Sequence, residues 1–214
     1  MATKNAQSPR AFVNVRNVGF AQIESMDETA TKYKSAMLTR GVKSVSSESS
    51  SEPKVTYADG LEIESGRSNG SRTISLLMHE FSGEVRDYIF GDTPDEQGIT
   101  AERRNQVTPE VAFWFVHERR DGTFKVYLFP RCIFNEPNLE ANQEEDDYEW
   151  TEETSEGMAM YRLSDEVRRF VYDSRNATGT LNDLLVKVFG SDYEGIKDIE
   201  NNILKSKSPV EETL

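Results

Sequence analysis

The chain has 214 residues, a formal net charge of −13 and a hydrophobic fraction of 36%. This length suffices for one domain with a proper core, and the low hydrophobic fraction predicts long polar loops or arms around it. The acidic balance argues against a protein that grips nucleic acid, because such a protein needs a basic surface to displace counterions from phosphates. It is compatible with passage of DNA without adhesion, and also with simple solubility.

The cysteine count and the hydropathy pattern exclude two further classes. One cysteine, Cys132, excludes an intramolecular disulfide framework and a thiolate metal cluster, and its apolar neighbours predict a buried side chain. No apolar run approaches the roughly 20 residues of a membrane span, and the N-terminus lacks the apolar core of a signal peptide. We therefore expect a protein without a membrane partner, kept in a cytoplasm or built into a particle that assembles there.

The N-terminal part is predicted to form an arm, a strand and a loop. Residues 1–10 are polar and lack periodicity, which predicts an arm that orders on docking. Residues 11–23 carry the apolar side chains of a strand, with a break at Asn17 or Gly19. Residues 24–40 are charged, so we predict a long loop. Its large side chains are Tyr33, Met37 and Leu38.

The stretch from Val55 to Gly91 has the clearest local pattern. A strand is expected to end in the tight-turn dipeptide Asp59-Gly60. Residues 61–66 then alternate between apolar or small and acidic or glycine positions, which is typical of a half-buried strand. A second turn cluster precedes a third strand over residues 73–78.

The period then changes to that of a helix. Ser82 can cap the helix, and Val85, Tyr88 and Ile89 fall on one face. Gly91 suits the C-terminal end, where a residue that tolerates the left-handed conformation is needed.

The second half contains the strongest hairpin signal. Residues 92–109 form a predicted loop, and residues 111–116 are apolar at every position, as in a strand covered on both faces. Asp121-Gly122 predicts a tight turn into a returning strand over residues 123–129. Pro130 removes a donor, so that strand is expected to bend there or to lie at an edge.

An acidic segment separates this hairpin from the C-terminal elements. Residues 140–156 are rich in carboxylates, and further strands are predicted over residues 158–163 and 167–172. Residues 180–190 begin with an approximate capping box and carry one apolar stripe, which predicts a helix. The isoleucines of residues 196–203 predict a second, shorter helix.

Together these elements predict a mainly β fold. About eight strands in meander-like order, with a short flanking helix and a C-terminal helical segment, indicate an antiparallel sandwich or barrel. We expect this domain to span residues 11–190, with an extension over residues 191–214.

Catalytic chemistry is poorly supplied by the sequence. The two histidines, His79 and His117, both stand beside a glutamate at a predicted strand end, which is ordinary for exposed polar residues. No nucleophile-elbow, phosphate-loop, zinc-helix or dinucleotide motif occurs. We expect no enzyme activity, no cofactor and no metal site.

The acidic run of residues 144–147 is open to two interpretations. It lacks the spacing that wraps a calcium ion, so a solvated loop is the ordinary interpretation. The alternative is a specific role, in which the run faces a channel or meets a basic patch of a neighbour such as Arg103-Arg104 or Arg119-Arg120.

The order of elements resembles the major tail protein family of long-tailed phages (siphophages) of Gram-positive hosts. The resemblance rests on a T-Y-A-D-G strand at Thr56–Gly60, an alternating strand, a glycine turn, a strand with S-L at Ser75-Leu76, and a short helix ending I-F-G at Gly91. It covers roughly residues 42–190 and rests on pattern and order rather than on a catalytic signature.

This resemblance implies a structural virion protein of the phage tail. In that family, copies close into hexameric rings that stack into a hollow tail tube, through which DNA passes during ejection. Implied partners are further copies of the chain, the tape measure protein, and the tail-tip and tail-terminator proteins. The implied location is the virion tail, reached from the host cytoplasm during assembly.

Charge and strand placement give the candidate assembly residues. Candidates for acidic residues at the lumen or between subunits are Glu62, Glu64, Glu144, Glu145, Asp146 and Asp147. Candidates for contacts between subunits are Tyr33, Met37, Leu38, Arg103, Arg104, Leu184, Leu185 and Val188.

Two alternatives remain open. Another ring-forming virion connector, such as a neck or tail-completion protein, would share the β architecture and the ring. A monomeric acidic binding module would instead stay monomeric at all concentrations and capture basic proteins in a salt-sensitive way.

Overall fold

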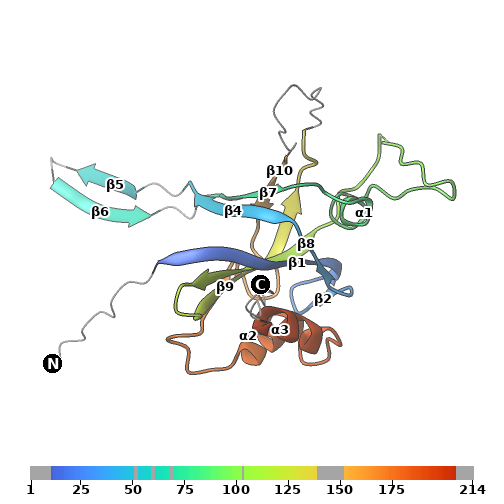
Figure 1. Ribbon diagram of the computed structural model, residues 1–214. Helices are drawn as coiled ribbons and strands as arrows, with labels where there is room; N and C mark the ends of the chain where they lie inside the picture. Colours follow the sequence, from blue (N-terminus) through green and yellow to red (C-terminus); the bar gives the residue numbers. More distant parts are fainter. Residues whose placement is uncertain are drawn as a thin grey trace, which may run out of the picture.

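The computed structural model describes residues 11–50, 53–58, 61–67, 70–102, 104–138 and 152–205. The fold is mainly β, with one large antiparallel sheet, a separate two-stranded sheet, a short helix and two C-terminal helices (Figure 1). The elements are β1 (Phe12–Met26), β2 (Thr31–Tyr33), β3 (Met37–Leu38), β4 (Val42–Ser49), β5 (Pro53–Ala58), β6 (Leu61–Arg67), β7 (Arg72–Met78), α1 (Gly83–Phe90), β8 (Val111–Arg119), β9 (Phe124–Phe134), β10 (Glu153–Ala159), β11 (Phe170–Asp173), α2 (Leu181–Phe189) and α3 (Ile196–Leu204).

The large sheet has nine strands and is open. Its main order is β2-β1-β8-β9-β10-β7-β4, with β3 on β1 and β11 on β9. The predicted mainly β, antiparallel class is confirmed. Where the sequence predicted a sandwich or barrel, the structure shows an open sheet and not a closed barrel. The sheet curls enough that Phe20 of β1 and Leu76 of β7 belong to one buried cluster, yet the two ends of the sheet are not joined by strand pairing.

Two hydrophobic clusters lie on the two faces of β8. On one face, Phe113 packs with Phe20, Phe129 and Phe134 in the concave interior of the sheet, where α1 also contributes. On the other face, Trp114 belongs to a second buried cluster with side chains of α2 and α3. Residues 111–116 are all buried, which confirms the prediction of a strand covered on both sides.

Residues 24–40 do not form the predicted long loop. β1 continues to Met26, and β2 and β3 both fold back to pair with it. A tight turn allows this return, because Asp27 Oδ1 accepts hydrogen bonds from the backbone N–H groups of Thr29 (2.7 Å) and Ala30 (2.9 Å). Strands of two or three residues are too short to leave a period in the sequence.

The predicted break in the first strand is confirmed. Asn17 has φ 55°, and the pairing register of β1 with β8 shifts between Arg16 and Gly19. Such a bulge in an antiparallel pair re-aims the neighbouring side chains. Here Arg16 and Asn17 point at the C-terminal end of α3. Arg16 Nη1 donates to the carbonyl of Ile203 (2.9 Å), and Asn17 Nδ2 donates to the carbonyl of Asn202 (2.6 Å).

Pro130 lies where β9 changes partners. The first part of β9, residues 125–128, pairs with β11, whereas residues 132–134 pair with β10. The pairing with β8 also shifts its register between Val111 and Phe113, opposite this point. The proline therefore occupies an irregular site where its missing donor costs little.

The predicted helices are confirmed, with one difference at a cap. Gly91 ends α1 at φ 80°, as expected, but the side chain of Ser82 makes no capping hydrogen bond. α2 has a full capping box, in which Thr180 Oγ1 accepts from the N–H of Asp183 (3.1 Å) and Asp183 accepts from the N–H of Thr180 (2.7 Å).

Two boundaries expected from the sequence shift. The strand expected over residues 158–163 is β10 at Glu153–Ala159, and the strand expected over residues 167–172 is β11 at Phe170–Asp173. The folded body also continues past the expected end at residue 190. All three isoleucines of α3 are buried in the same cluster as Trp114, so the body extends through Leu204.

Candidate assembly surfaces

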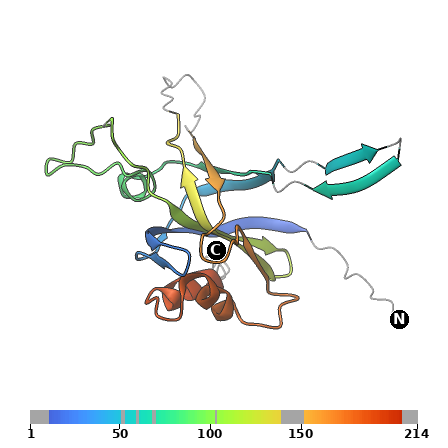
Figure 2. The same ribbon diagram turned by 180° about the vertical axis from the view of Figure 1, so that it is seen from behind.

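The two-stranded sheet β5–β6 forms an arm that extends away from the body. Its strands pair from Pro53–Arg67 to Ala58–Leu61, and in the described part of the chain they pair with each other alone. Figures 1 and 2 show the arm projecting beyond the end of β4 and β7. At its base, Ser50 N–H donates to the carbonyl of Ser71 (3.0 Å), and their hydroxyls lie 2.9 Å apart. Each arm strand therefore has an outer edge with unpaired backbone donors and acceptors.

The outer face of β4, β7 and β10 is polar. Inward positions of these strands, such as Ile74, Leu76 and Ala159, belong to the concave core. The exposed outward positions are Ser44, Ser46, Glu48, Thr73, Thr154, Glu156 and Met158. This face is built mainly from small hydroxyl side chains, with two carboxylates and one methionine, a composition that favours hydration over tight apolar packing.

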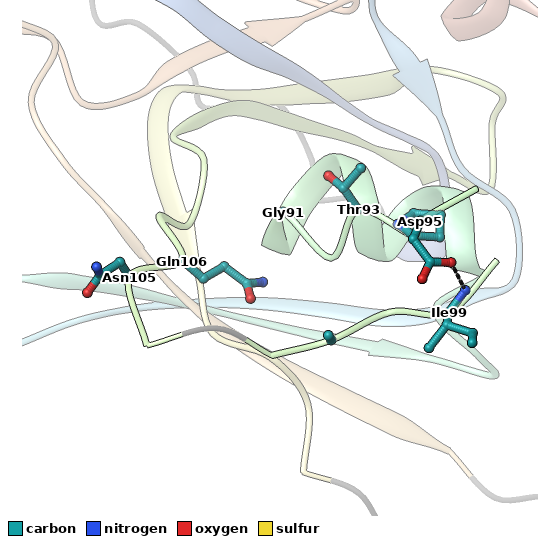
Figure 3. Close-up of a pocket in the computed structure, with 8 residues that line it drawn as sticks. Gly91, Thr93, Asp95, Ile99, Asn105 and Gln106 are labelled. Carbon is teal, nitrogen blue, oxygen red and sulfur yellow. Dashed lines mark hydrogen bonds between the residues drawn. The ribbon is translucent and has the colours of Figure 1, made fainter. Parts of the chain in front are cut away.

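A cavity of about 560 Å³ lies in the loop that follows α1 (Figure 3). Asp95, its one acidic group, accepts a hydrogen bond from the backbone N–H of Ile99 (2.8 Å), drawn dashed in Figure 3. The lining residues are Gly91, Thr93, Pro94, Asp95, Ile99, Ala101, Asn105 and Gln106. Among these described residues there is no histidine, cysteine or lysine, and the polar side chains are those of Thr93, Asp95, Asn105 and Gln106.

A carboxyl pair ties this loop to the end of β9. Asp92 accepts from Gln106 Nε2 (2.8 Å) and shares a hydrogen bond with Glu136. That hydrogen bond, with partial burial and the negative charge of Asp92, raises the pKa of Glu136 to about 7. The pair therefore holds a proton that an isolated glutamate would have lost.

The histidines do not meet in a site. His117 stacks on Phe12 with ring centroids 4.0 Å apart, and burial followed by the positive charges of Arg119 and Lys125 lowers its pKa. Within the described ranges, no three His, Cys, Asp or Glu side chains are placed to hold a metal ion. Cys132 is fully buried, as predicted, and burial raises the pKa of its thiol.

The structure divides the predicted inter-subunit residues into three groups. Tyr33, Leu185 and Val188 are buried in the chain's own core, so they are not available as surface contacts, and the Tyr33 hydroxyl donates to the Pro130 carbonyl (3.0 Å). Half-buried residues are Met37 and Leu184, and exposed residues are Leu38 and Arg104. Amphipathic periodicity marks an apolar face but does not say whether the same chain or another covers it.

The structure describes two of the six acidic candidates. Glu62 and Glu64 lie in β6, with Tyr57 and Thr56 as their backbone partners in β5. The other four, Glu144, Glu145, Asp146 and Asp147, lie outside the described residues, as does the basic candidate Arg103.

Several buried or paired charges were not predicted from the sequence. Arg119 forms a two-point ion pair with Asp173, at 2.9 and 2.7 Å, and Arg162 is 5% exposed between Asp165 and the end of α2. Asp173 is 54 residues from Arg119, and Val188, whose carbonyl accepts from Arg162, is 26 residues away, so no local pattern could have shown these two contacts. Asp165 is only three residues from Arg162.

Comparison of the chain with protein-family models and with curated proteins found no match. None of the described helices is long and apolar enough to cross a membrane.

Proposed function

We propose that this chain is a structural subunit of a phage tail, a major tail protein whose copies close into rings that stack into a hollow tube. The hexameric ring and the passage of DNA come from the resemblance described above. The observation that carries the proposal is the β5–β6 arm, which projects from the body with two unpaired strand edges.

An arm of this kind favours assembly over an isolated existence. Exposed strand edges pair with other strands, and a monomer normally protects them with charge, short length or a covering segment. A closed ring offers another solution, because a head-to-tail contact repeated around a rotation satisfies every edge. The arm can add its strand to the sheet of a neighbour by backbone hydrogen bonds alone.

The charge and the polar outer face support the same proposal. A chain of net charge −13 repels the phosphates of DNA, as a channel for its passage must. The hydroxyl-rich face of β4, β7 and β10 is a second surface that would stay hydrated beside such a channel.

The test is negative-stain electron microscopy of the full chain over a concentration series, with mass measured in parallel. We expect hollow tubes or stacked rings from the natural chain. A variant in which residues 52–69 are replaced by Asn-Gly keeps the Ser50–Ser71 base and lacks the arm, and it should stay monomeric under the same conditions.

A control separates the arm from general surface effects. The double substitution Lys32→Ala and Lys197→Ala changes two exposed charges away from the arm and should assemble like the natural chain. A natural chain that stays monomeric at every concentration would count against the tube. An arm-free variant that still forms tubes would refute the role of the arm.

A further inference from the structure

Three arginines gather at the base of the arm. Arg72 begins β7, and Arg168 and Arg169 lie just before β11. Arg168 Nη1 donates to the carbonyl of Gly70 (2.5 Å), which joins the segment before β11 to the arm base. Arg72 Nη1 donates to Ser47 Oγ (3.0 Å). These contacts hold Arg72 and Arg168 at the arm base, and the charges of Arg168 and Arg169 both lie close enough to act on Arg72.

The cluster has no acidic partner among the described residues. Elsewhere in the described chain, seven other basic side chains form ion pairs with carboxylates, including Arg119 with Asp173 and Arg131 with Glu110. The contacts of Arg72 and Arg168 are instead with a hydroxyl, a backbone carbonyl and the ring of Tyr161, 4.8 Å from the Arg168 guanidinium. In a chain with 38 acidic and 25 basic residues, three such arginines side by side are unusual.

The cluster is also electrostatically incomplete. Burial, followed by the positive charges of Arg169 and Arg168, lowers the pKa of Arg72. Arg169 and Tyr161 are exposed, and Arg72 and Arg168 are half-buried. Like charges held together in a partly dry setting are stabilised by an anionic group that arrives from outside.

The most acidic segment of the chain is attached at the opposite end of the same strands. Arg72 pairs with Ala159 at one end of β10, whereas Glu153 pairs with Met78 at the other. These ends are six residues apart, or about 20 Å at roughly 3.3 Å per residue. The segment 139–151 joins β9 to β10 at the Glu153 end. It contains six carboxylates and no lysine or arginine: Glu140, Glu144, Glu145, Asp146, Asp147 and Glu149.

We propose that the arginine cluster of Arg72, Arg168 and Arg169 binds the acidic segment 139–151 of a second copy of this chain. The arginine cluster and the point where the segment joins β10 lie at opposite ends of β7 and β10, so the contact is head-to-tail and repeats from copy to copy. The inference deepens the proposed tube function by naming a contact between subunits, and it rests on that function for its biological setting.

The first test measures binding of a synthetic peptide with the sequence of residues 139–151 to the full chain by fluorescence anisotropy. We expect binding that weakens as NaCl rises, because the contact is ionic. Arg168→Ala with Arg169→Ala should weaken it about tenfold, the size expected from losing two or three charge pairs. The exposed pair Lys32→Ala and Lys197→Ala, with the same change in charge, should bind as the natural chain does. Equal affinity for both double variants would overturn the proposal.

Further experiments test whether a variant stays folded and whether another ligand occupies the arginine cluster. Arg169→Glu changes one exposed side chain, so it should keep the melting temperature of the natural chain and still weaken binding. At a concentration where the natural chain is monomeric, a variant with Glu144→Gln, Glu145→Gln, Asp146→Asn and Asp147→Asn should bind the peptide as the natural chain does. Tighter binding to that variant would mean that the chain's own segment fills the cluster, which overturns the role of a second copy. Stronger binding of a single-stranded oligonucleotide of equal length would overturn the peptide as ligand.

A mixing experiment tests the contact in the assembled protein. The arginine variant keeps an intact acidic segment, and the neutralised variant keeps an intact arginine cluster. Each should fail to form long assemblies alone, and a mixture should form dimers with one intact contact, measured by analytical ultracentrifugation. Tubes from the arginine variant would overturn this inference and leave the tube function standing. If the peptide binds specifically but no condition yields tubes, the arginine contact stands and the tube function is overturned.

Discussion

Gly19 in β1 lies directly against the indole ring of Trp114 in β8. A Cβ at this position would sit 2.3 Å from Cζ2 of the ring, far inside contact distance. Trp114 is fully buried, with Phe189 of α2 edge-on at 5.8 Å, so the ring has little room to move. Gly19→Ala should therefore lower the free energy of unfolding by about 1–3 kcal/mol, the usual cost of overpacking.

Urea denaturation followed by tryptophan fluorescence measures this change. The matched control is Gly83→Ala at the start of α1, where an added Cβ meets no atom within 4 Å. This control should leave stability unchanged or raise it by up to about 1 kcal/mol, because alanine is the better helix former. Equal effects of the two substitutions would contradict the close packing at Gly19.

The Arg119–Asp173 ion pair makes stability depend on pH in the acid range. The hydrogen bonds from Arg119 lower the pKa of Asp173 to about 2. Because the folded-state pKa lies below the unfolded value of 3.8, the contribution is complete above pH 4 and is lost as the pH falls toward 2. Asp173→Asn should cost about 1–2 kcal/mol at pH 6 and much less at pH 2.5. Denaturation curves at both pH values test this, and a cost that does not vary with pH would contradict it.

The Asp92–Glu136 pair makes stability depend on pH in the opposite direction. The folded-state pKa of Glu136 is raised from 4.5 to about 7, so the folded protein loses stability as the pH rises from 4.5 through 7. Glu136→Gln keeps a donor toward Asp92 without the charge. It should raise the melting temperature at pH 8 and leave it unchanged at pH 4. A melting temperature unaffected at both pH values would mean that the two carboxyls do not share a proton.

At the scale of elements, Arg162 fastens α2 to the sheet. Its Nη1 donates to the carbonyl of Val188 at the C-terminal end of α2 (2.7 Å), and Asp165 pairs with the rest of the guanidinium at 2.9 and 2.5 Å. Arg162→Met leaves Asp165 without its charged partner and the helix end without a donor, which should cost about 2–4 kcal/mol. Hydrogen exchange should quicken in α2 before it quickens in β8. The control Lys197→Met, at an exposed position of α3, should change neither.

The elements that the sequence predicted well are those with a strong period or a strong turn. The helix from Gly83 to Phe90, the capping box at Thr180 and the Asp121-Gly122 hairpin all carry such signals. The predicted position of β10 was wrong because the side chains at its inward positions are small. Ser155, Gly157 and Ala159 face the core, and a Cβ at Gly157 would lie 2.6 Å from the Phe134 ring, so no large apolar residue marks the strand.

The candidate surfaces were harder to predict for a different reason. The sequence pointed to Leu185 and Val188 as apolar, but the covering partner proved to be the same chain. The arginine cluster draws on Arg72 and Arg168, almost 100 positions apart, which sheet pairing alone brings together. Long-range register decides both outcomes, and one-dimensional periodicity does not encode it.

At the scale of the whole molecule, the arm and the body are separable. Replacing residues 52–69 by Asn-Gly removes strands that pair with each other alone, within the described chain, and keeps the hydrogen-bonded Ser50–Ser71 base. The melting temperature should therefore change by less than about 4 °C, equivalent to roughly 1 kcal/mol for a domain of this size. Calorimetry measures it, and a large drop would show that the arm is part of the folding unit.

The contacts of Arg16 and Asn17 in β1 with the end of α3 also bring the two ends of the described body close together. Ala11 precedes β1 and accepts a hydrogen bond from Arg120, and the carbonyl of Lys205 accepts one from Arg16 (3.0 Å), five residues farther along the same strand. That interval is about 17 Å of extended chain, which a linker of about eight residues can span. The described body is thus suited to circular permutation, with Ala11 and Lys205 joined by this linker and new ends opened between β5 and β6. Such a permutant would carry a reporter dye at the far end of the arm, where the docking of a neighbour would be registered directly.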